Sequence, residues 1–273
     1  MNSLLQSIQK TSVPYGTAVM WWLGQMGLIV KMNHTILCVD YFASEYPDRQ
    51  VPPLIPMEEM TGIDAFLGSH NHDDHIDHNA WQTFARKCPE AKFVFPAPHL
   101  KSVLADGVAE ENCRGISEGD VIRIGDVTIR CIAAAHEFLD RDPDTLFYPY
   151  LQYIIEGNGL RIYHAGDTLR YEGMLQKLTA FGPIDAALLP INGRDGKRYR
   201  RNCIGNMTFQ EAADLAGELR PGLVIPGHFD MFADNSADPH EFADYLDAKY
   251  QGQVSCLIPQ YAVPVRVTAP DPS

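Results

Sequence analysis

The sequence predicts an αββα sandwich, in which two mixed β-sheets pack face to face and helices cover both outer faces. Each half of the chain begins with apolar, strand-like runs joined by short turns and then alternates strand-like with helix-like segments. No repeat at solenoid spacing and no Pro/Gly/Ser-rich linker interrupts the 273 residues. We therefore expect a single α/β domain over residues 1–273.

The first half opens with an expected antiparallel meander, formed by residues 18–24, 27–32 and 35–40. A buried strand is expected next, over residues 62–69, and residues 77–87 have helical spacing with Asp77 as a possible N-cap. Further along the chain we expect a strand, a short helix and a hairpin with Gly125-Asp126 at its turn: residues 91–97, 98–108 and 121–135.

The second half repeats this order. Asn158-Gly159 separates two strand-like runs and is a strong hairpin signal, because Asn-Gly readily takes the positive φ of a type I′ turn. Two further strands are expected at residues 184–191 and 222–228. Between them, residues 208–219 predict a helix whose Thr208 and Glu211 form a capping box.

Charge, cysteine usage and the first residues argue against several classes of protein. The formal net charge of −13 argues against a general nucleic-acid binder, because phosphates would be repelled. The six cysteines include no Cys-x-x-Cys pair and indicate no disulfide framework. Residues 1–16 resemble neither a secretory signal nor a membrane span, so we expect a cytoplasmic protein without a membrane partner.

One stretch directly after an expected strand, "SHNHDDHID", is dense in metal-ligating side chains. It contains the pattern His-x-His-x-Asp-His, formed by His70, His72, Asp74 and His75. Two histidines two residues apart project to the same side of an extended chain, so both can reach one cation. The following Asp and His can serve a second cation about 3.5–4 Å away, as in dimetal hydrolases. Asp77 and His78 are expected to begin the next helix, with a solvated imidazole at His78.

Three more polar residues follow apolar strands: His136, Asp167 and His228. Each alone is more often a satisfied core or loop residue than a ligand. Together they are what a site at one edge of the sandwich requires.

This series resembles the metallo-β-lactamase superfamily over almost the whole chain. The five motifs of that superfamily match Asp40, then the His70–His75 stretch, then His136, Asp167 and His228, in this order. The resemblance implies a metal-dependent hydrolase. The second motif has His72 where the diiron oxidoreductase branch carries Glu, which favours hydrolysis over redox chemistry.

The resemblance also implies roles for these residues. His70, His72 and His136 would hold one divalent metal ion, Asp74, His75 and His228 would hold a second, and Asp167 would bridge both. Asp40 would lie behind the ligands and accept a hydrogen bond that orients a ligand loop or a histidine. A metal-bound hydroxide would attack the substrate, with Asp74 as the catalytic residue that orients it.

Several stretches are similar to the L-ascorbate-6-phosphate lactonase branch: "MWWLGQMGLIVK", "SHNHDDHID", "YHAGDT" and "VIPGHFDMFADNSADPHEF". This similarity implies a carboxylic ester hydrolase that opens the lactone ring of a phosphorylated sugar acid. It also implies Zn²⁺ or Mn²⁺ as the two ions and a homo-oligomer.

A basic stretch, "NGRDGKRYRR", is the candidate binding site for the substrate phosphate in an otherwise acidic chain. Its cationic side chains are Arg194, Lys197, Arg198, Arg200 and Arg201. Guanidinium groups suit phosphate oxygens, although a solvated surface loop accounts for the same run.

Two other functions use the same residues. A metal-dependent phosphodiesterase or nuclease would need the same dimetal site and the same basic loop, and the net charge argues against it. A non-catalytic metal-binding protein on this fold would bind metal without hydrolysing lactones, phosphodiesters or thioesters.

Overall fold

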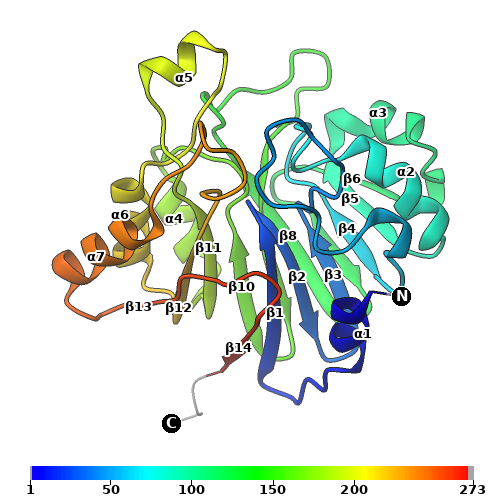
Figure 1. Ribbon diagram of the computed structural model, residues 1–273, viewed down its shortest axis with the longest axis horizontal. Helices are drawn as coiled ribbons and strands as arrows, with labels where there is room; N and C mark the ends of the chain where they lie inside the picture. Colours follow the sequence, from blue (N-terminus) through cyan, green and yellow to red (C-terminus); the bar gives the residue numbers. More distant parts are fainter. Residues whose placement is uncertain (1, 270–273) are drawn as a thin grey trace.

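The computed structural model describes residues 2–269, and its strands form two mixed seven-stranded sheets packed against each other (Figure 1). In the first sheet the strand order is β14-β1-β2-β3-β4-β5-β6, and in the second it is β13-β12-β11-β10-β9-β8-β7. The strands of the first sheet are β1 (Thr17–Gly24), β2 (Gly27–Met32), β3 (Thr35–Val39), β4 (Ala65–Leu67), β5 (Lys92–Pro96), β6 (Cys113–Ile116) and β14 (Pro264–Thr268). Those of the second are β7 (Val121–Ile124), β8 (Val127–Ala133), β9 (Leu151–Gly157), β10 (Leu160–His164), β11 (Ala186–Pro190), β12 (Leu223–Gly227) and β13 (Ser255–Cys256).

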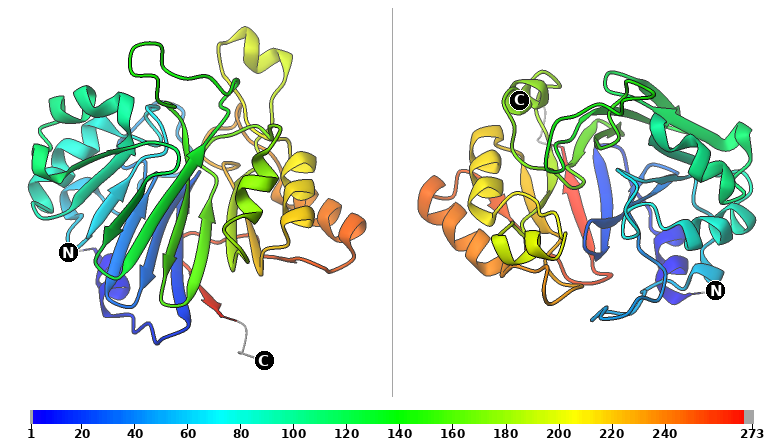
Figure 2. Two further views of the ribbon diagram at one scale, coloured as in Figure 1. Left: turned by 180° about the vertical axis from the view of Figure 1, so that it is seen from behind. Right: turned by 90° about the horizontal axis from the view of Figure 1, so that it is seen from above.

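Helices cover the outer faces of both sheets, so the predicted αββα sandwich is confirmed (Figure 2). The first sheet carries α1 (Ser3–Lys10), α2 (His78–Lys87) and α3 (Leu100–Ala105), and the second carries α4 (Met174–Thr179), α6 (Phe209–Leu219) and α7 (Pro239–Tyr250). The short α5 (Gly196–Arg200) stands away from both layers at the top of Figure 1. The remaining helical turns are 3₁₀ segments at Met57–Glu59, Ala97–His99 and Glu110–Asn112.

The period of two along the strands separates three apolar layers. In β1, the even-numbered residues from Ala18 to Trp22 lie in the cluster between the sheets. The odd-numbered residues from Val19 to Leu23 lie in a second cluster with apolar side chains of α1 and α2. A third cluster joins the outer face of the second sheet to α4, α6 and α7. Because both faces of each sheet are buried, the central strands read as continuous apolar runs.

The structure confirms the elements for which the sequence carries the clearest local signals. The meander β1-β2-β3 is antiparallel, and Asp77 caps α2 by accepting a hydrogen bond from the Ala80 amide. Asn158 and Gly159 both have positive φ between β9 and β10, as a type I′ turn requires. The capping box at the start of α6 is present.

Other elements differ from the expectation or lacked a clear signal. The helix expected over residues 98–108 is shorter, because it is divided into the 3₁₀ turn Ala97–His99 and helix α3. The sequence did not indicate α1, α4, α5, α7, β6, β13 or β14. Several of these are very short, and β14 forms only by pairing with β1, about 250 residues earlier in the chain. Within residues 2–269, no helix is long and apolar enough to cross a lipid bilayer.

Candidate metal centre

The side chains predicted as metal ligands meet at one edge of the sandwich, just beyond the carboxyl ends of several strands. His70 to His75 follow β4, and His136 follows β8. Asp167 and His228 follow β10 and β12, which belong to the second sheet. The residues therefore arrive from four different strand ends, and the packing of the two sheets brings these ends together.

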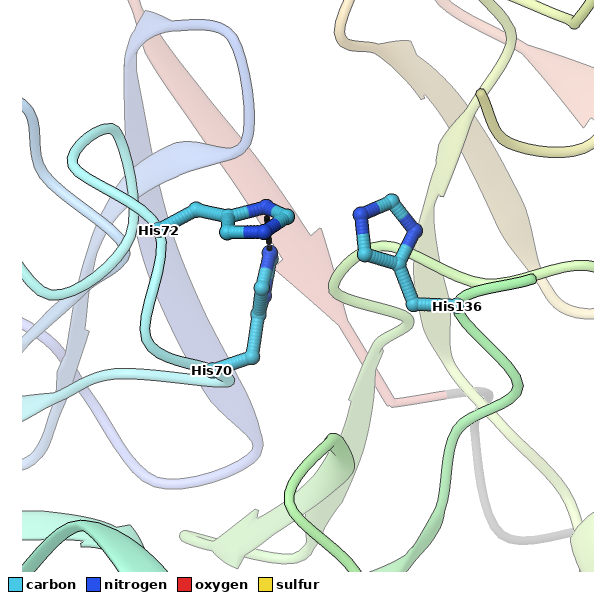
Figure 3. A group of neighbouring side chains, drawn as sticks. All are labelled: His70, His72 and His136. Carbon is cyan, nitrogen blue, oxygen red and sulfur yellow. Dashed lines mark hydrogen bonds between the residues drawn. The ribbon is translucent and has the colours of Figure 1, made fainter. Parts of the chain in front are cut away.

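Three histidines form the first group of possible ligands (Figure 3). Nitrogen atoms of His70, His72 and His136 all lie within 4.8 Å of one another. The ring centroids are 4.5 Å apart for His70 and His72, and His136 lies 5.0 Å from each. His136 faces the other two rings from a separate loop. Three imidazoles at this spacing can share one cation.

A second group lies beside the first and consists of Asp74, His75 and His228. Nε2 of His75 and Nε2 of His228 each lie 3.5 Å from Oδ2 of Asp74. Asp167 stands between the two groups: its carboxylate lies 3.4 Å from His75, 3.3 Å from His228 and 4.0 Å from His136. A carboxylate in this position can contact a cation in either group.

Burial and mutual repulsion keep the first group of histidines neutral. Burial, together with the neighbouring imidazoles, lowers the pKa of His70 well below its usual value. Burial also lowers the pKa of His136 to about 4 and that of His72 below its usual value. Neutral imidazole is the form that binds metal, so these side chains are in the binding form at neutral pH.

The second group is held together by charge. Burial opposes a proton on His228, but Asp167 and Asp74 outweigh it and raise the pKa of His228 to about 10. In the same way, burial is outweighed at His75, where Asp167, Asp74 and Asp40 raise the pKa well above its usual value. Although burial would raise the pKa of Asp167, the two histidines hold it well below its usual range. A divalent cation bound here would take the place of these protons.

Two buried polar atoms at the centre show that the residues fit a cation. Nε2 of His75 and Oδ1 of Asp167 have no hydrogen-bond partner in the described part of the chain. Buried polar atoms are rarely left without a partner, since each costs about 1–3 kcal/mol. The oxygen and nitrogen donors present here suit zinc, manganese and similar divalent ions.

Asp40 and Ser69 lie behind the ligands. Oδ2 of Asp40 accepts hydrogen bonds from Nδ1 of His75 at 2.7 Å and from the Ser69 hydroxyl at 2.6 Å. Oδ1 accepts the backbone N–H of Ser69 at 2.7 Å. Asp40 and His228 both have positive φ, which is uncommon outside glycine and tends to occur at functional sites. The sequence analysis missed Ser69, although it directly precedes the histidine motif.

A glycine lets the Asp167 turn pass close to this network. Gly166 has φ +55°, and a Cβ atom there would lie 2.8 Å from Cβ of Ser69. The imidazole of His164 supports the same turn, because its Nδ1 accepts the Gly166 N–H while its Nε2 donates to the Met26 carbonyl. Both nitrogens of His164 are thereby used by the backbone.

The expected solvated imidazole at His78 is wrong. His78 is half-buried, its Nδ1 lies 2.6 Å from Oδ2 of Asp106, and its Nε2 lies 2.7 Å from Oδ1 of Asn71. The carboxylate of Asp106 comes from the end of α3, a contact that the local sequence could not indicate. His78 therefore ties α3 to the loop that carries His70 and His72.

A cavity of about 390 Å³ opens directly onto the candidate ligands His72 and Asp74. One wall is aromatic: the ring of Phe42 lies 5.8 Å from that of Tyr46 and 6.5 Å from that of Phe232. Polar groups, including Asp234, line other parts of it. The cavity is large enough for a small organic molecule.

The basic loop lies next to this cavity, and its arginines differ in their surroundings. Arg194 makes two hydrogen bonds to Glu211, at 2.5 and 2.8 Å, and Arg198 pairs with Asp195 at 2.7 Å. Arg201 pairs at 2.7 Å with Asp234 in the cavity wall. The side chains of Lys197 and Arg200 are exposed and have no ion-pair or hydrogen-bond partner among residues 2–269.

A sandwich of two mixed sheets with a cluster of histidines and aspartates at one edge defines a metal-dependent hydrolase. The family model described as "Beta-lactamase superfamily domain" matches residues 38–229. The chain belongs to this superfamily, and the match spans every candidate ligand.

Comparisons with individual proteins agree with this family. The chain is 28% identical to the probable L-ascorbate-6-phosphate lactonase UlaG of Salmonella paratyphi B, over 87% of this chain and 77% of that protein. Among solved structures, the metallo hydrolase Igni18 of Ignicoccus hospitalis superposes with a TM-score of 0.72 at 21% identity, over 92% of this chain and 98% of that one. The isothiocyanate hydrolase from Delia radicum gut bacteria superposes with a TM-score of 0.71 at 17% identity, covering 90% and 98% of the two chains. At these identities the structural likeness establishes the fold.

Proposed function

We propose that this protein is a lactonase that binds two divalent ions, Zn²⁺ or Mn²⁺, and opens the lactone ring of a phosphorylated sugar acid such as L-ascorbate 6-phosphate. The observation that carries this proposal is the position of Asp167 between two groups of three possible ligands each. His70, His72 and His136 would hold one ion, and Asp74, His75 and His228 the other. Asp167 would contact both, within one hydrolase domain that spans the whole chain.

Two residues of this chain, Asp40 and Asp74, would act beside the bound ions. When bound, divalent ions would lower the pKa of a water molecule towards neutrality and polarise the substrate carbonyl. Asp40 holds His75 through Nδ1, so that Nε2 points to the centre. Asp74 lines the cavity, and its Oδ2 faces His75 and His228. Its Oδ1 is the atom that can accept the proton from the attacking water and return it to the ring oxygen when the lactone opens.

The substrate class rests on the relative and on the surroundings of the cavity. The 28% identical relative from Salmonella paratyphi B is a probable lactonase of L-ascorbate 6-phosphate, a lactone that carries a phosphate group. A cavity of about 390 Å³ suits one sugar-sized ring, and aromatic side chains can pack against its carbon atoms. We assign the phosphate to the basic loop beside the cavity. Arg194, Arg198 and Arg201 are paired with carboxylates, while Lys197 and Arg200 present their positive charge to solvent.

The experiment that tests this function combines metal analysis with a substrate screen. The purified protein is loaded with Zn²⁺ or Mn²⁺, its metal content is measured, and hydrolysis is followed for one lactone with and without a phosphate group. Bis-p-nitrophenyl phosphate and RNA are included as phosphodiesters. Two ions per chain and preference for the phosphorylated lactone support the proposal. Turnover of the phosphodiesters alone would identify a phosphodiesterase, and two bound ions without hydrolysis of any substrate would indicate a metal-binding protein.

A further inference from the structure

Gln25, in the tight turn between β1 and β2, touches both a candidate carboxylate ligand and a candidate histidine ligand. Its side chain is fully buried. The amide Nε2 donates to Oδ2 of Asp74 at 3.3 Å and lies 3.4 Å from Nδ1 of His228. We propose that Gln25 is a positioning residue for the second metal ion, because it holds Asp74 and His228 at the separation that the ion requires. This inference rests on the two-ion site proposed above.

The backbone of Gln25 is anchored to the segment that carries His228. The carbonyl oxygen of Gln25 accepts the N–H of His228 at 3.0 Å. Its own N–H donates to Oδ1 of Asp230 at 3.0 Å, and its side-chain Oε1 accepts the N–H of Met231 at 3.4 Å. The β1–β2 turn and residues 228–231 are thus joined by three hydrogen bonds through one residue. These bonds fix the position of Gln25 relative to His228.

The turn is itself held rigidly. Gln25 has φ +52°, a left-handed conformation that non-glycine residues seldom adopt and that surrounding contacts must enforce. The indole N–H of Trp22 donates to the Gln25 carbonyl at 2.9 Å. The Trp22 ring stacks between Phe229 and Tyr261, with centroids 5.1 and 4.7 Å away. The Tyr261 hydroxyl in turn donates to Asp230.

Asp74 needs such a support because it lies at the edge of the centre. Its side chain is 19% exposed, whereas those of His75 and His228 are 0% and 3% exposed. The residues before it, Asn71 to Asp73, are exposed, and the contacts of His78 with Asn71 and of His70 with His72 hold the loop without reaching the Asp74 carboxylate. The Gln25 amide supplies a hydrogen bond to the carboxylate from the rigid turn. Hydrogen-bonding partners behind metal ligands typically contribute about 10–100-fold to metal affinity.

The test uses the full chain and the variants Gln25→Met and Gln25→Asn. Methionine matches the size of glutamine but removes the amide, and asparagine keeps the amide but is one methylene too short to reach Asp74. Gln152→Met is the matched control, because Gln152 is also fully buried and its Nε2 and Oε1 bond to the Ala133 carbonyl and the Tyr163 hydroxyl, which are not candidate ligands.

Metal-free protein is titrated with Co²⁺, and binding is measured by the visible d–d absorbance and by competition with a chelator. We expect two equivalents in the wild-type protein and in Gln152→Met. In both Gln25 variants the second equivalent should bind about 10–100-fold more weakly, with the first unchanged. Circular dichroism establishes which variants are folded. Either Gln25→Met or Gln25→Asn decides the result if it is folded. Wild-type affinity for both equivalents in a folded Gln25 variant overturns the inference, whereas failure of the wild-type protein itself to bind a second equivalent overturns the two-ion site.

Discussion

Nδ1 of His75 donates a 2.7 Å hydrogen bond to Oδ2 of Asp40, a residue at the end of a strand 35 positions earlier. This bond determines which nitrogen of His75 remains for a metal. With Nδ1 bonded to Asp40, Nε2 faces Asp74 at 3.5 Å and Asp167 at 3.4 Å. Asp40 also holds the Ser69 hydroxyl and N–H, so one carboxylate orients both a candidate ligand and the start of the histidine motif.

Asp40→Asn should therefore weaken metal binding without removing any proposed ligand. The asparagine amide retains the size of the side chain, but it no longer offers two charged acceptors to Ser69 and His75. We expect metal affinity to fall by about 10–100-fold. Competition with a chelator, followed by metal analysis of the dialysed protein, measures the change.

Asp185→Asn is the control for this substitution. Asp185 also accepts a hydrogen bond from a backbone N–H, that of Arg161 at 2.7 Å, but it precedes β11 at the opposite end of the sheets. Metal affinity should be unchanged in this variant. An equal loss of affinity in both variants would mean that Asp40 acts through the stability of the fold.

Asp167→Asn and His72→Ala test one buried and one exposed position of the candidate site. Asp167 is buried between His75, His136 and His228, and His72 is exposed at the cavity. Both substitutions should abolish hydrolysis, with a loss of at least about 10³-fold, and reduce the bound metal while leaving a folded protein. Metal content and activity are measured on the same sample. Hydrolysis that persists after the metal is lost would contradict the proposed mechanism.

The ion pair between His78 and Asp106 should make stability depend on pH. The hydrogen bond to Asp106 raises the pKa of His78 above its usual value of 6.5. The stabilisation is then fully present below about pH 6.5 and is lost as the pH rises through the higher folded-state pKa. The difference in urea midpoint between the wild-type protein and Asp106→Asn should shrink between pH 6 and pH 9. A difference that does not change with pH would show that the pair contributes no charge-dependent stability.

Much of the fold follows from local signals in the sequence. Unbroken apolar runs mark strands that are buried on both faces, and the Asn158-Gly159 pair and the Thr208–Glu211 capping box mark a turn and a helix start. Short elements carry too few residues for such a signal. Strand β14 and the half-buried position of His78 depend on partners that are distant in the sequence, β1 and Asp106.

The candidate site, like the fold, contains residues that a local pattern indicates and residues that only distant contacts reveal. His70, His72, Asp74 and His75 could be recognised because four ligand-type residues follow one strand, and His136, Asp167 and His228 because each follows another. The structure brings all seven together, and their role as ligands stays a prediction. Ser69 and Gln25 could not be found from local pattern. Their importance comes from what they contact: Asp40, Asp74 and His228.

Asp77→Ala should destabilise the protein and loosen the cavity wall. The Asp77 carboxylate caps α2 and also accepts hydrogen bonds from the N–H groups of Ala43 and Ser44 and from the Ser44 hydroxyl. Losing an N-cap costs about 0.5–2 kcal/mol, and each buried donor left unpaired costs more. We expect a loss of about 2–4 kcal/mol in the free energy of unfolding, measured with urea. Phe42 lines the cavity and directly precedes Ala43, so loss of the bonds at Ala43 should displace it. KM for the substrate should then also rise. A loss below 1 kcal/mol would contradict this role.

The basic loop offers a direct test of phosphate recognition. Lys197 and Arg200 are exposed and have no side-chain partner among residues 2–269, so their neutralisation breaks no internal ion pair. If they bind the substrate phosphate, the double variant Lys197→Gln, Arg200→Gln loses charge-assisted hydrogen bonds of about 1.5–3 kcal/mol. KM for a phosphorylated lactone should then rise by about 10–100-fold, while KM for the same lactone without phosphate stays constant.

Arg194→Gln separates binding from loop structure. Arg194 is held by Glu211, whose carboxylate also accepts the Thr208 N–H at the start of α6. Its neutralisation should lower stability and raise KM for both lactones to a similar extent, because it disturbs the loop and not a phosphate contact. If the Lys197, Arg200 variant also changes both KM values equally, the basic loop does not recognise the substrate phosphate.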